Sequence, residues 1–256
     1  GKTLAFTVPL LQKIFIPDNS PQAIVLCPTR ELCIQVAGEI GKIGSHMKKL
    51  KILPVYGGQP IGRQIRVLNK GVHVVIGTPG RVLDHIERKT LDLKGISTVV
   101  LDEADEMLDM GFLDDIKEIF TFLPKERQTL LFSATMPTAI KNLAKTILNE
   151  PEFITLKKRD VTNAKITQTF YVVDVRERDD ALIRLYDFKN PSKSIIFCRT
   201  KKEVDRLSTF MVSQGFMAKG LHGDMEQRQR EEAIRAFKTS KLEILIATDV
   251  AARGLD

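Results

Sequence analysis

Residues 97–105 read STVVLDEAD, so a short β-branched run, Ser97–Leu101, is followed directly by three carboxylates. Such a run, apolar on both faces, is typical of a parallel strand that helices cover on each side. Open parallel sheets bind their ligands just beyond the carboxyl ends of the strands. Asp102, Glu103 and Asp105 are therefore predicted to lie at the ligand-binding edge of an α/β sheet.

The flanking sequence repeats this pattern of short strands and amphipathic helices. Further strands are predicted at Ala23–Cys27, Val72–Ile76 and Thr129–Phe132. Helical spacing of apolar residues predicts helices at Leu4–Ile14, Glu31–Ile43, Leu113–Phe122 and Pro137–Leu148. Strands that alternate with helices form βαβ units, so we expect a twisted parallel sheet with helices on both faces.

A polar, charged stretch near residues 158–165 interrupts the alternation and predicts a linker. The alternation then resumes in the second part of the chain. Strands are predicted at Thr169–Val173, Ser194–Cys198 and Ile244–Ala247, and helices at Asp179–Phe188, Lys201–Gln214 and Glu226–Phe237. The chain is therefore expected to be two α/β units in series, residues 1–157 and residues 166–256.

The composition excludes some functional classes and favours others. No apolar run approaches the ~18 residues of a membrane span, and no secretory signal is present, so we expect no membrane association. Lys and Arg number 39 against 32 Asp and Glu, and this net charge of +7 favours a polyanionic partner. Cys27, Cys33 and Cys198 have no CxxC spacing, which points to a reducing, cytoplasmic compartment and to no structural metal.

Two short motifs carry the chemistry of nucleotide hydrolysis. Gly1-Lys2-Thr3 matches the last three residues of a phosphate-binding P-loop, although a tripeptide by itself is a weak signal. Residues 102–105 are more specific, because P-loop hydrolases hold Mg²⁺ on an acidic residue after a buried strand. The alternative interpretation of these acids is a helix N-terminus, where they suit the helix dipole.

Taken together, the chain resembles the DEAD-box ATP-dependent RNA helicases of the bacterial type. The family's motifs occur in the family's order along essentially the whole chain. The matching stretches are GKT at 1–3, PTREL at 28–32, GG at 57–58, TPGR at 78–81, DEAD at 102–105, SAT at 133–135, IFCRT at 196–200, HGDMEQRQR at 222–230 and ATDVAARGLD at 247–256. The resemblance implies two tandem RecA-like domains, an ATP-binding domain at 1–157 and a helicase C-terminal domain at 166–256.

The resemblance also implies roles in ATP hydrolysis. Gly1, Lys2 and Thr3 would bind ATP, with Lys2 on the β- and γ-phosphates and Thr3 ligating Mg²⁺. Asp102 would hold Mg²⁺ through water, and Glu103 would be the general base for the attacking water. Asp105, Ser133 and Thr135 would couple the nucleotide state to domain closure, and Asp256 would contact the ribose.

A second set of residues is implied to face RNA. Small residues let the sugar–phosphate strand approach the backbone, while threonines and arginines bond phosphate oxygens, so binding should not depend on base sequence. The set is Thr29, Arg30, Gly57, Gly58, Thr78, Gly80, Arg81, Arg199, Gly223, Asp224, Gln227 and Thr248.

Two elements of the family pattern lie outside the sequence. The upstream glutamine motif and the front of the P-loop are absent, and so is the downstream motif that supplies the family's arginine finger. The chain is therefore interpreted as a fragment of a longer helicase core, with the second domain incomplete.

Two other functions compete with an RNA helicase. One is a DNA-directed translocase of the wider helicase superfamily, although related DNA enzymes more often carry histidine in place of Asp105. The other is an RNA-binding clamp with little turnover. The specific RNA, the oligomeric state and the protein partners cannot be read from the sequence.

Several isolated polar and sulfur-containing residues have structural interpretations. His73 is expected to be a core histidine with satisfied hydrogen bonds, and His46 and His85 are expected at the surface. Met107 is interpreted as core, and Ser133 has no His–Asp partners for a hydrolase triad. Lys48, Lys49, Arg63 and Arg66 are expected on solvated faces.

Overall fold

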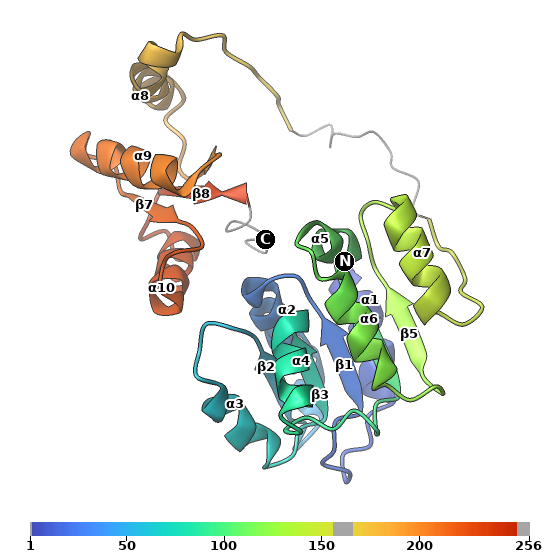
Figure 1. Ribbon diagram of the computed structural model, residues 1–256. Coiled ribbons are helices and arrows are strands. Elements are labelled where there is room, and N and C mark those ends of the chain that lie inside the picture. The colour runs from blue at the N-terminus through green and yellow to red at the C-terminus, as the bar shows by residue number, and fades with distance from the viewer. Residues whose placement is uncertain (1, 156–165, 250–256) are drawn as a thin grey trace. The chain divides into compact units, whose positions relative to one another are not determined.

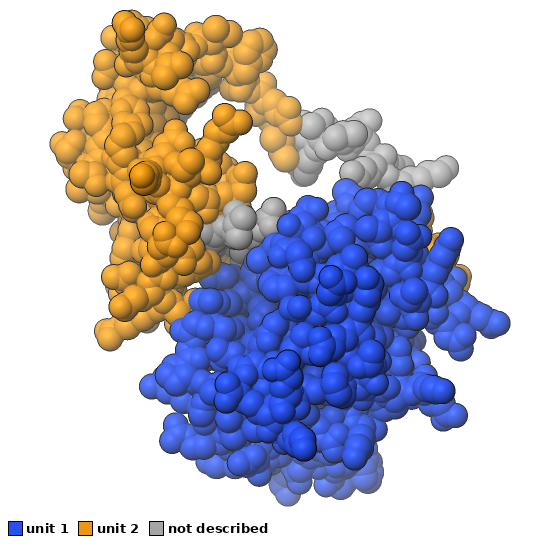
Figure 2. Space-filling view, in the orientation of Figure 1, with its two compact units in different colours: residues 1–151, 253–256 blue, residues 152–252 orange. Residues whose placement is uncertain are grey.

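The structure is a computed structural model that describes residues 2–155 and 166–249. The chain divides into two compact units, one within residues 1–151 and the other within residues 152–252 (Figure 2). The predicted linker, residues 158–165, lies outside the described residues. The domain boundaries therefore stay a prediction, and each unit is described by itself.

A parallel sheet of five strands forms the centre of the first unit (Figure 1). The strand order is β2-β3-β1-β4-β5, and all neighbouring pairs are parallel. The strands are β1 (Ala23–Leu26), β2 (Ile52–Val55), β3 (Val74–Gly77), β4 (Thr98–Leu101) and β5 (Gln128–Leu131). Every residue of β1, β3 and β4 is buried, as expected for central strands covered on both faces.

Helices cover both faces of this sheet. They are α1 (Lys2–Gln12), α2 (Arg30–Ile43), α3 (Ile61–Leu68), α4 (Pro79–Glu87), α5 (Ala104–Asp109), α6 (Leu113–Thr121) and α7 (Thr138–Ile147). Alternation along each strand separates two cores: Val25 faces α1 and α2, whereas Ile24 and Leu26 face the side of α4 to α7. The predicted α/β class with helices on both faces is confirmed.

A glycine at the end of β3 lets the strands and α4 pack closely. A Cβ at Gly77 would lie 2.3 Å from Val82 Cγ2 and 2.7 Å from Val55 Cγ2. Both atoms belong to buried side chains, which have no room to move aside. Gly77 thus allows α4 to begin immediately beyond the sheet edge, which brings residues 78–81 to that edge.

The second unit contains a smaller parallel sheet in the order β6-β8-β7. Its strands are β6 (Ser194–Cys198), β7 (Ala218–Leu221) and β8 (Ile244–Thr248), and its helices are α8 (Arg178–Lys189), α9 (Lys201–Ser213) and α10 (Gln227–Lys238). A core of Cys198, Val204, Leu207, Met211, Ile244 and Ile246 joins the sheet to α9. The predicted strands at 194–198 and 244–247 and all three predicted helices are present.

One predicted strand is wrong. Residues 169–173 form no strand in the structure, although TFYVV has strong β propensity. Phe170 is 89% exposed and Val172 is 92% exposed, so neither has a core to pack against. Strand propensity expresses packing on a pleated surface, and without a neighbouring strand the backbone has no ladder to join.

One strand and three α-helices of the first unit and one strand of the second were not predicted. These are β2, α3, α4, α5 and β7. The strand β2 contains Pro54, and β7 contains Gly220 and the polar Lys219. Both strands are the outermost strands of their sheets, where a proline or glycine disturbs the hydrogen-bond ladder less than in a central strand. Pairing with the neighbouring strand therefore overrides these weak local preferences.

No helix within residues 2–155 or 166–249 is both long enough and apolar enough to span a bilayer.

Candidate functional site

Asp102 directly follows β4 and lies at the carboxyl edge of the first sheet. Its backbone N–H donates to the Leu26 carbonyl at 2.9 Å, which extends the ladder one residue beyond the strand. The residue is 3% exposed, and its Oδ1 has no hydrogen-bond partner among the described residues. Burial raises the pKa of the Asp102 carboxyl, while the positive charge of Lys2 and a backbone hydrogen bond from Glu103 oppose that rise. A buried carboxylate oxygen without a partner is suited to a cation or to the water around one.

Glu103 has an unusual backbone conformation at the junction between β4 and α5. Its φ of 55° and ψ of 54° are left-handed, a region that residues other than glycine seldom adopt. Such a conformation costs on the order of 1–3 kcal/mol, and in folded proteins it clusters at functional sites. The turn places a half-buried carboxylate beside Asp102 at the sheet edge.

Asp105 is hydrogen-bonded to the segment that follows β5. Its Oδ2 accepts from both the backbone N–H and the hydroxyl of Thr135, each at 2.8 Å. In return, the Ser133 hydroxyl accepts from the Asp105 backbone N–H at 3.2 Å and donates to the Thr135 carbonyl at 2.7 Å. Burial by itself raises the pKa of Asp105, but these hydrogen bonds lower it below its usual value. The predicted coupling residues thus form one network.

Lys2 and Thr3 open α1 on the same unit. Lys2 is exposed and lies near enough to Asp102 to lower the pKa of that carboxyl, and Thr3 is half-buried. Gly1 and Asp256, the other residues predicted to bind ATP, lie outside the described residues. Of the residues predicted to bind ATP, the structure therefore describes Lys2 and Thr3 but not Gly1 or Asp256.

Two arginines and two glycines of the predicted RNA-facing set lie together. A Cβ on Gly58, which has a φ of 83°, would lie 2.1 Å from Arg30 Nη1, and a Cβ on Gly57 would lie 3.6 Å from Arg30 Nη2. That same Gly57 Cβ would lie 4.0 Å from Arg81 Nη2. Both guanidinium groups therefore lie against the turn after β2, and at Gly58 a Cβ would displace the Arg30 head group.

The remaining predicted RNA-facing residues of this unit lie in adjacent loops. Thr29 is buried, and its hydroxyl caps α2 by accepting from Leu32 N at 3.2 Å, so it keeps its proton for donation. Thr78 precedes α4 and makes no capping bond with its side chain. Gly80 is exposed, and a Cβ there would lie 3.5 Å from the Asp115 carboxylate. Because β1 lies between β3 and β4, the RNA-facing set and the acidic set occupy neighbouring parts of one sheet edge.

In the second unit, the predicted RNA-facing residues follow the carboxyl ends of their strands. Cys198 pairs with Thr248 and Leu221 pairs with Ala247, so the loops that begin at 199 and 222 and the end of β8 share an edge. Asp224 is paired with Lys201, which lowers the pKa of its carboxyl, and Gln227 donates to Glu231 at 3.0 Å. Arg199 and Gly223 are exposed.

Two histidine predictions had opposite outcomes. His73 is buried, with Nδ1 accepting from Lys51 N at 2.9 Å and Nε2 lying 3.0 Å from the Ile16 carbonyl, as expected for a satisfied core histidine. The prediction that His85 lies at the surface is wrong, because it is fully buried. The signal was present in the sequence: Val82, His85 and Ile86 have i, i+3 and i+4 spacing on one face of α4.

Two family models match the chain over most of its length. The DEAD/DEAH box helicase model matches residues 1–143, and the helicase conserved C-terminal domain model matches residues 177–256. The chain belongs to the DEAD/DEAH box helicase family. This membership confirms the resemblance deduced from the motif series at residues 1–3 through 247–256.

Curated relatives of this helicase family cover the whole chain. DEAD-box ATP-dependent RNA helicase CshA of Bacillus subtilis (strain 168) is 52% identical over 256 residues, which are 100% of this chain and 52% of that relative. CshA of Bacillus cereus (strain ATCC 10987) is also 52% identical over 256 residues, which are 49% of its length. The chain thus spans about half the length of the curated relatives it matches.

Solved helicase structures share the fold. Saccharomyces cerevisiae Dbp5 bound to RNA and ADP BeF3 is 34% identical, with a TM-score of 0.86 over 99% of this chain and 64% of that chain. A DEAD box protein from the hyperthermophile Methanococcus jannaschii is 46% identical, with a TM-score of 0.57 over 100% of this chain and 68% of its own. The two α/β units are therefore tandem RecA-like domains of the DEAD-box type.

Proposed function

We propose that the protein containing this chain is an ATP-dependent RNA helicase, which couples ATP hydrolysis to RNA binding and to local duplex unwinding or ribonucleoprotein remodelling. The observation that carries the proposal is the sheet edge of the first unit. There the buried carboxylate of Asp102, one oxygen of which has no partner among the described residues, and the strained Glu103 lie beside loops that present Arg30 and Arg81 around two glycines. The complex of Dbp5 with RNA and ADP BeF3 supports the same pair of ligands.

The acidic residues fit the chemistry of phosphoryl transfer. Asp102 would hold Mg²⁺ through water, with Thr3 as a direct ligand, and Mg²⁺ would offset the charge that develops on the transferring phosphoryl group. Residues 2–155 and 166–249 contain no cluster of three or more potential metal-ligating His, Cys, Asp or Glu side chains. Mg²⁺ commonly keeps several waters and is held mainly by phosphate oxygens and one or two carboxylates.

The roles of the other residues are those that the resemblance to the family implies. Lys2 would bind the β- and γ-phosphates, and Glu103 would accept the proton of the attacking water. The network of Asp105, Ser133 and Thr135 would transmit the nucleotide state to domain closure, since it ties the acidic motif to the segment after β5. Gly1 and Asp256 would complete the ATP site.

Substitution of Asp102 by asparagine separates metal binding from folding. The folded-state pKa of Asp102 is raised, so the protonated carboxyl is the form that stabilises the fold. This contribution to the free energy of unfolding is full below the unfolded pKa near 3.8, and it is lost as the pH rises through the folded pKa. At pH 7 without ligand, Asp102→Asn should therefore unfold at the same temperature as the parent or a higher one. The Mg²⁺ requirement for ATP hydrolysis should rise by about tenfold or more.

The measurements are thermal unfolding with and without Mg-ATP and a Mg²⁺ titration of the ATPase rate. Asp114→Asn, on the exposed side of α6, is the matched control. A clear loss of unliganded stability in Asp102→Asn would show that the carboxylate supports the fold and not a cation.

The proposed RNA contacts predict a measurable salt dependence. Three phosphate contacts, from Arg30, Arg81 and Arg199, give a slope of about −2 in log K against log salt for a single strand, or about 20-fold weaker binding between 50 and 200 mM salt. Two unrelated single strands should bind alike, and Arg81→Ala should reduce the slope by about 0.7. A strong preference for one strand at constant salt would refute sequence-independent binding.

One experiment distinguishes this function from its competitors. Steady-state phosphate release by the full-length protein is measured with RNA, with DNA and without nucleic acid. An RNA helicase is stimulated by RNA alone, a DNA translocase by DNA, and a clamp with little turnover by neither.

We also place the protein in the cytoplasm, a proposal that its three free, buried cysteines support.

A further inference from the structure

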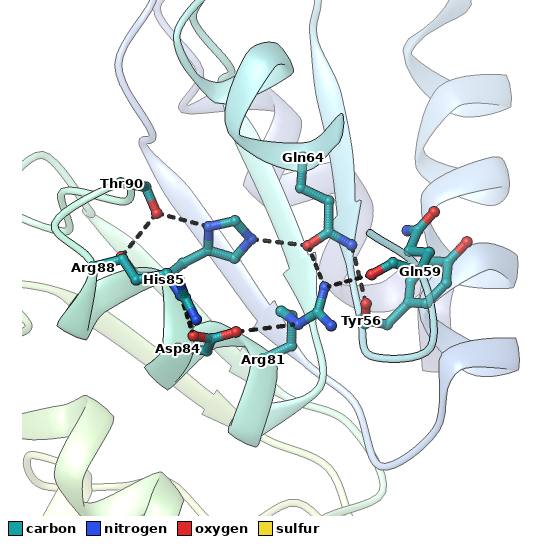
Figure 3. Close-up of polar contacts among 8 residues, drawn as sticks. All are labelled: Tyr56, Gln59, Gln64, Arg81, Asp84, His85, Arg88 and Thr90. Atoms are coloured by element: carbon teal, nitrogen blue, oxygen red, sulfur yellow. Dashed lines mark hydrogen bonds and ion pairs between the residues drawn. The ribbon is translucent and has the colours of Figure 1, made fainter. Parts of the chain in front are cut away.

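We propose that Gln64 and His85 are positioning residues that hold the Arg81 guanidinium in the orientation in which it meets RNA. The proposal rests on the function proposed above, in which Arg81 contacts an RNA phosphate. Neither Gln64 nor His85 belongs to a motif that the sequence singled out. They connect the turn after β2 to α3 and α4 through a buried chain of hydrogen bonds (Figure 3).

Gln64 is the centre of this chain. It lies on α3 and is 2% exposed. Its Nε2 donates to the Tyr56 carbonyl at 3.0 Å, and its Oε1 accepts from Arg81 Nη1 at 3.2 Å. The same Oε1 lies 2.8 Å from His85 Nε2 (Figure 3). The Tyr56 carbonyl can only accept and Arg81 can only donate, so the orientation of the Gln64 amide is determined.

The amide orientation determines the protonation pattern of His85. Because Gln64 Oε1 is an acceptor, the hydrogen of the neutral ring is on Nε2. Nδ1 is then the acceptor, 2.8 Å from the Thr90 hydroxyl oxygen, whose single proton is shared with the His85 carbonyl at 3.0 Å. Burial and the positive charge of Arg81 lower the pKa of His85, in agreement with a neutral ring. Every polar atom of this buried histidine and glutamine therefore has a partner.

These contacts hold one side of the Arg81 guanidinium. Nη1 donates to Gln64 and also to the Gln59 carbonyl at 3.2 Å, and Nε lies 3.7 Å from the Asp84 carboxylate. Nη2 makes no hydrogen bond within the described part of the chain and lies on the Gly57 side of the turn. An unrestrained arginine loses much rotamer freedom when it binds, so fixing Arg81 beforehand lowers the entropic cost of the phosphate contact.

A double-mutant cycle tests this role in the full-length protein. Gln64→Met keeps the side-chain volume and removes all three side-chain hydrogen bonds, and it should weaken binding of a single-stranded RNA by about fivefold to tenfold at constant salt. In an Arg81→Ala background the same substitution should change RNA affinity by less than about twofold, because its effect passes through Arg81. ATP affinity should not change in either background.

Two further variants make the test decisive. His85→Leu removes the Nε2 donor while leaving Gln64 in place, and it should weaken RNA binding only when Arg81 is present. This variant tests the proposal independently of whether Gln64→Met folds. Gln22→Met is the matched control, because Gln22 is also buried and also hydrogen-bonds to the backbone, in its case that of Phe15 and Asp18. Gln22 lies at the amino ends of the strands, away from the carboxyl ends where Arg81 lies. The Gln22→Met variant should leave RNA affinity unchanged.

The outcomes distinguish this inference from the proposed function. Equal losses of RNA affinity with and without Arg81 would show a structural role and overturn the inference alone. A loss with Arg81→Ala but none with Gln64→Met or His85→Leu would also overturn it alone. Absence of RNA binding by the parent protein would overturn the proposed function as well.

Discussion

Replacement of Glu103 by glutamine in the complete protein is expected to lower the rate of ATP hydrolysis by about 10²–10⁴-fold. Glutamine can still hydrogen-bond the attacking water, but it cannot accept its proton. ATP and RNA affinities should stay within about twofold, because glutamine has the same shape and its amide tolerates the left-handed backbone as the carboxylate does. The change thus acts on the transition state and not on binding.

Single-turnover hydrolysis and equilibrium binding of ATP and RNA measure the two halves of this expectation. Glu118→Gln, an exposed carboxylate on α6, is the control for the loss of one negative charge. If Glu103→Gln hydrolyses ATP at nearly the parental rate, another group is the base.

Substitution of Gly58 by alanine should weaken RNA binding by about 100-fold. The added Cβ would lie 2.1 Å from Arg30 Nη1 and 2.6 Å from Arg30 Cζ. The arginine head group is flexible and must move away from the turn, which removes two charge-assisted hydrogen bonds to phosphate, each worth about 1.5 kcal/mol. The first unit should still fold, because the clash involves no backbone atom.

Gly111→Ala provides a matched control for backbone strain. Gly111 has a φ of 82° against 83° for Gly58, but a Cβ there would meet no atom within 4 Å. Both variants therefore impose the same left-handed alanine, and only Gly58→Ala displaces Arg30. Fluorescence titration of labelled RNA compares them at one salt concentration. Equal losses of affinity in the two variants would attribute the effect to strain and contradict the proposed role of Arg30.

The candidate site was partly predictable for a specific reason. Asp102 follows the buried strand β4 directly and Asp105 lies in the first turn of α5, so their place at the sheet edge depends only on local sequence and on the geometry of parallel sheets. The strain at Glu103 was not predictable, because no residue preference marks a left-handed glutamate. The hydrogen bonds from Thr135 to Asp105 join residues 30 positions apart, and only the pairing of β4 with β5 makes them possible.

The errors have equally specific causes. His85 was predicted at the surface, yet Gln64 on α3 and Thr90 after α4 supply the hydrogen-bond partners that let it be buried. The charge of Arg81, on the same helix, lowers the pKa of His85 further than burial alone does. Residues 169–173 were predicted as a strand from propensity alone, and propensity does not supply a neighbouring strand.

The amino-acid sequence by itself determined the α/β class, the helicase family and the order of the motifs. Each of these is written in local patterns: β-branched runs, helical spacing, and short polar segments directly after strands. Tertiary structure decided the rest, since strand order β2-β3-β1-β4-β5 brings together residues that the chain keeps far apart. It alone placed Arg30 against Gly58 and linked Arg81 through Gln64 to His85, because these contacts depend on buried packing and on hydrogen-bond partners that no short stretch of sequence contains.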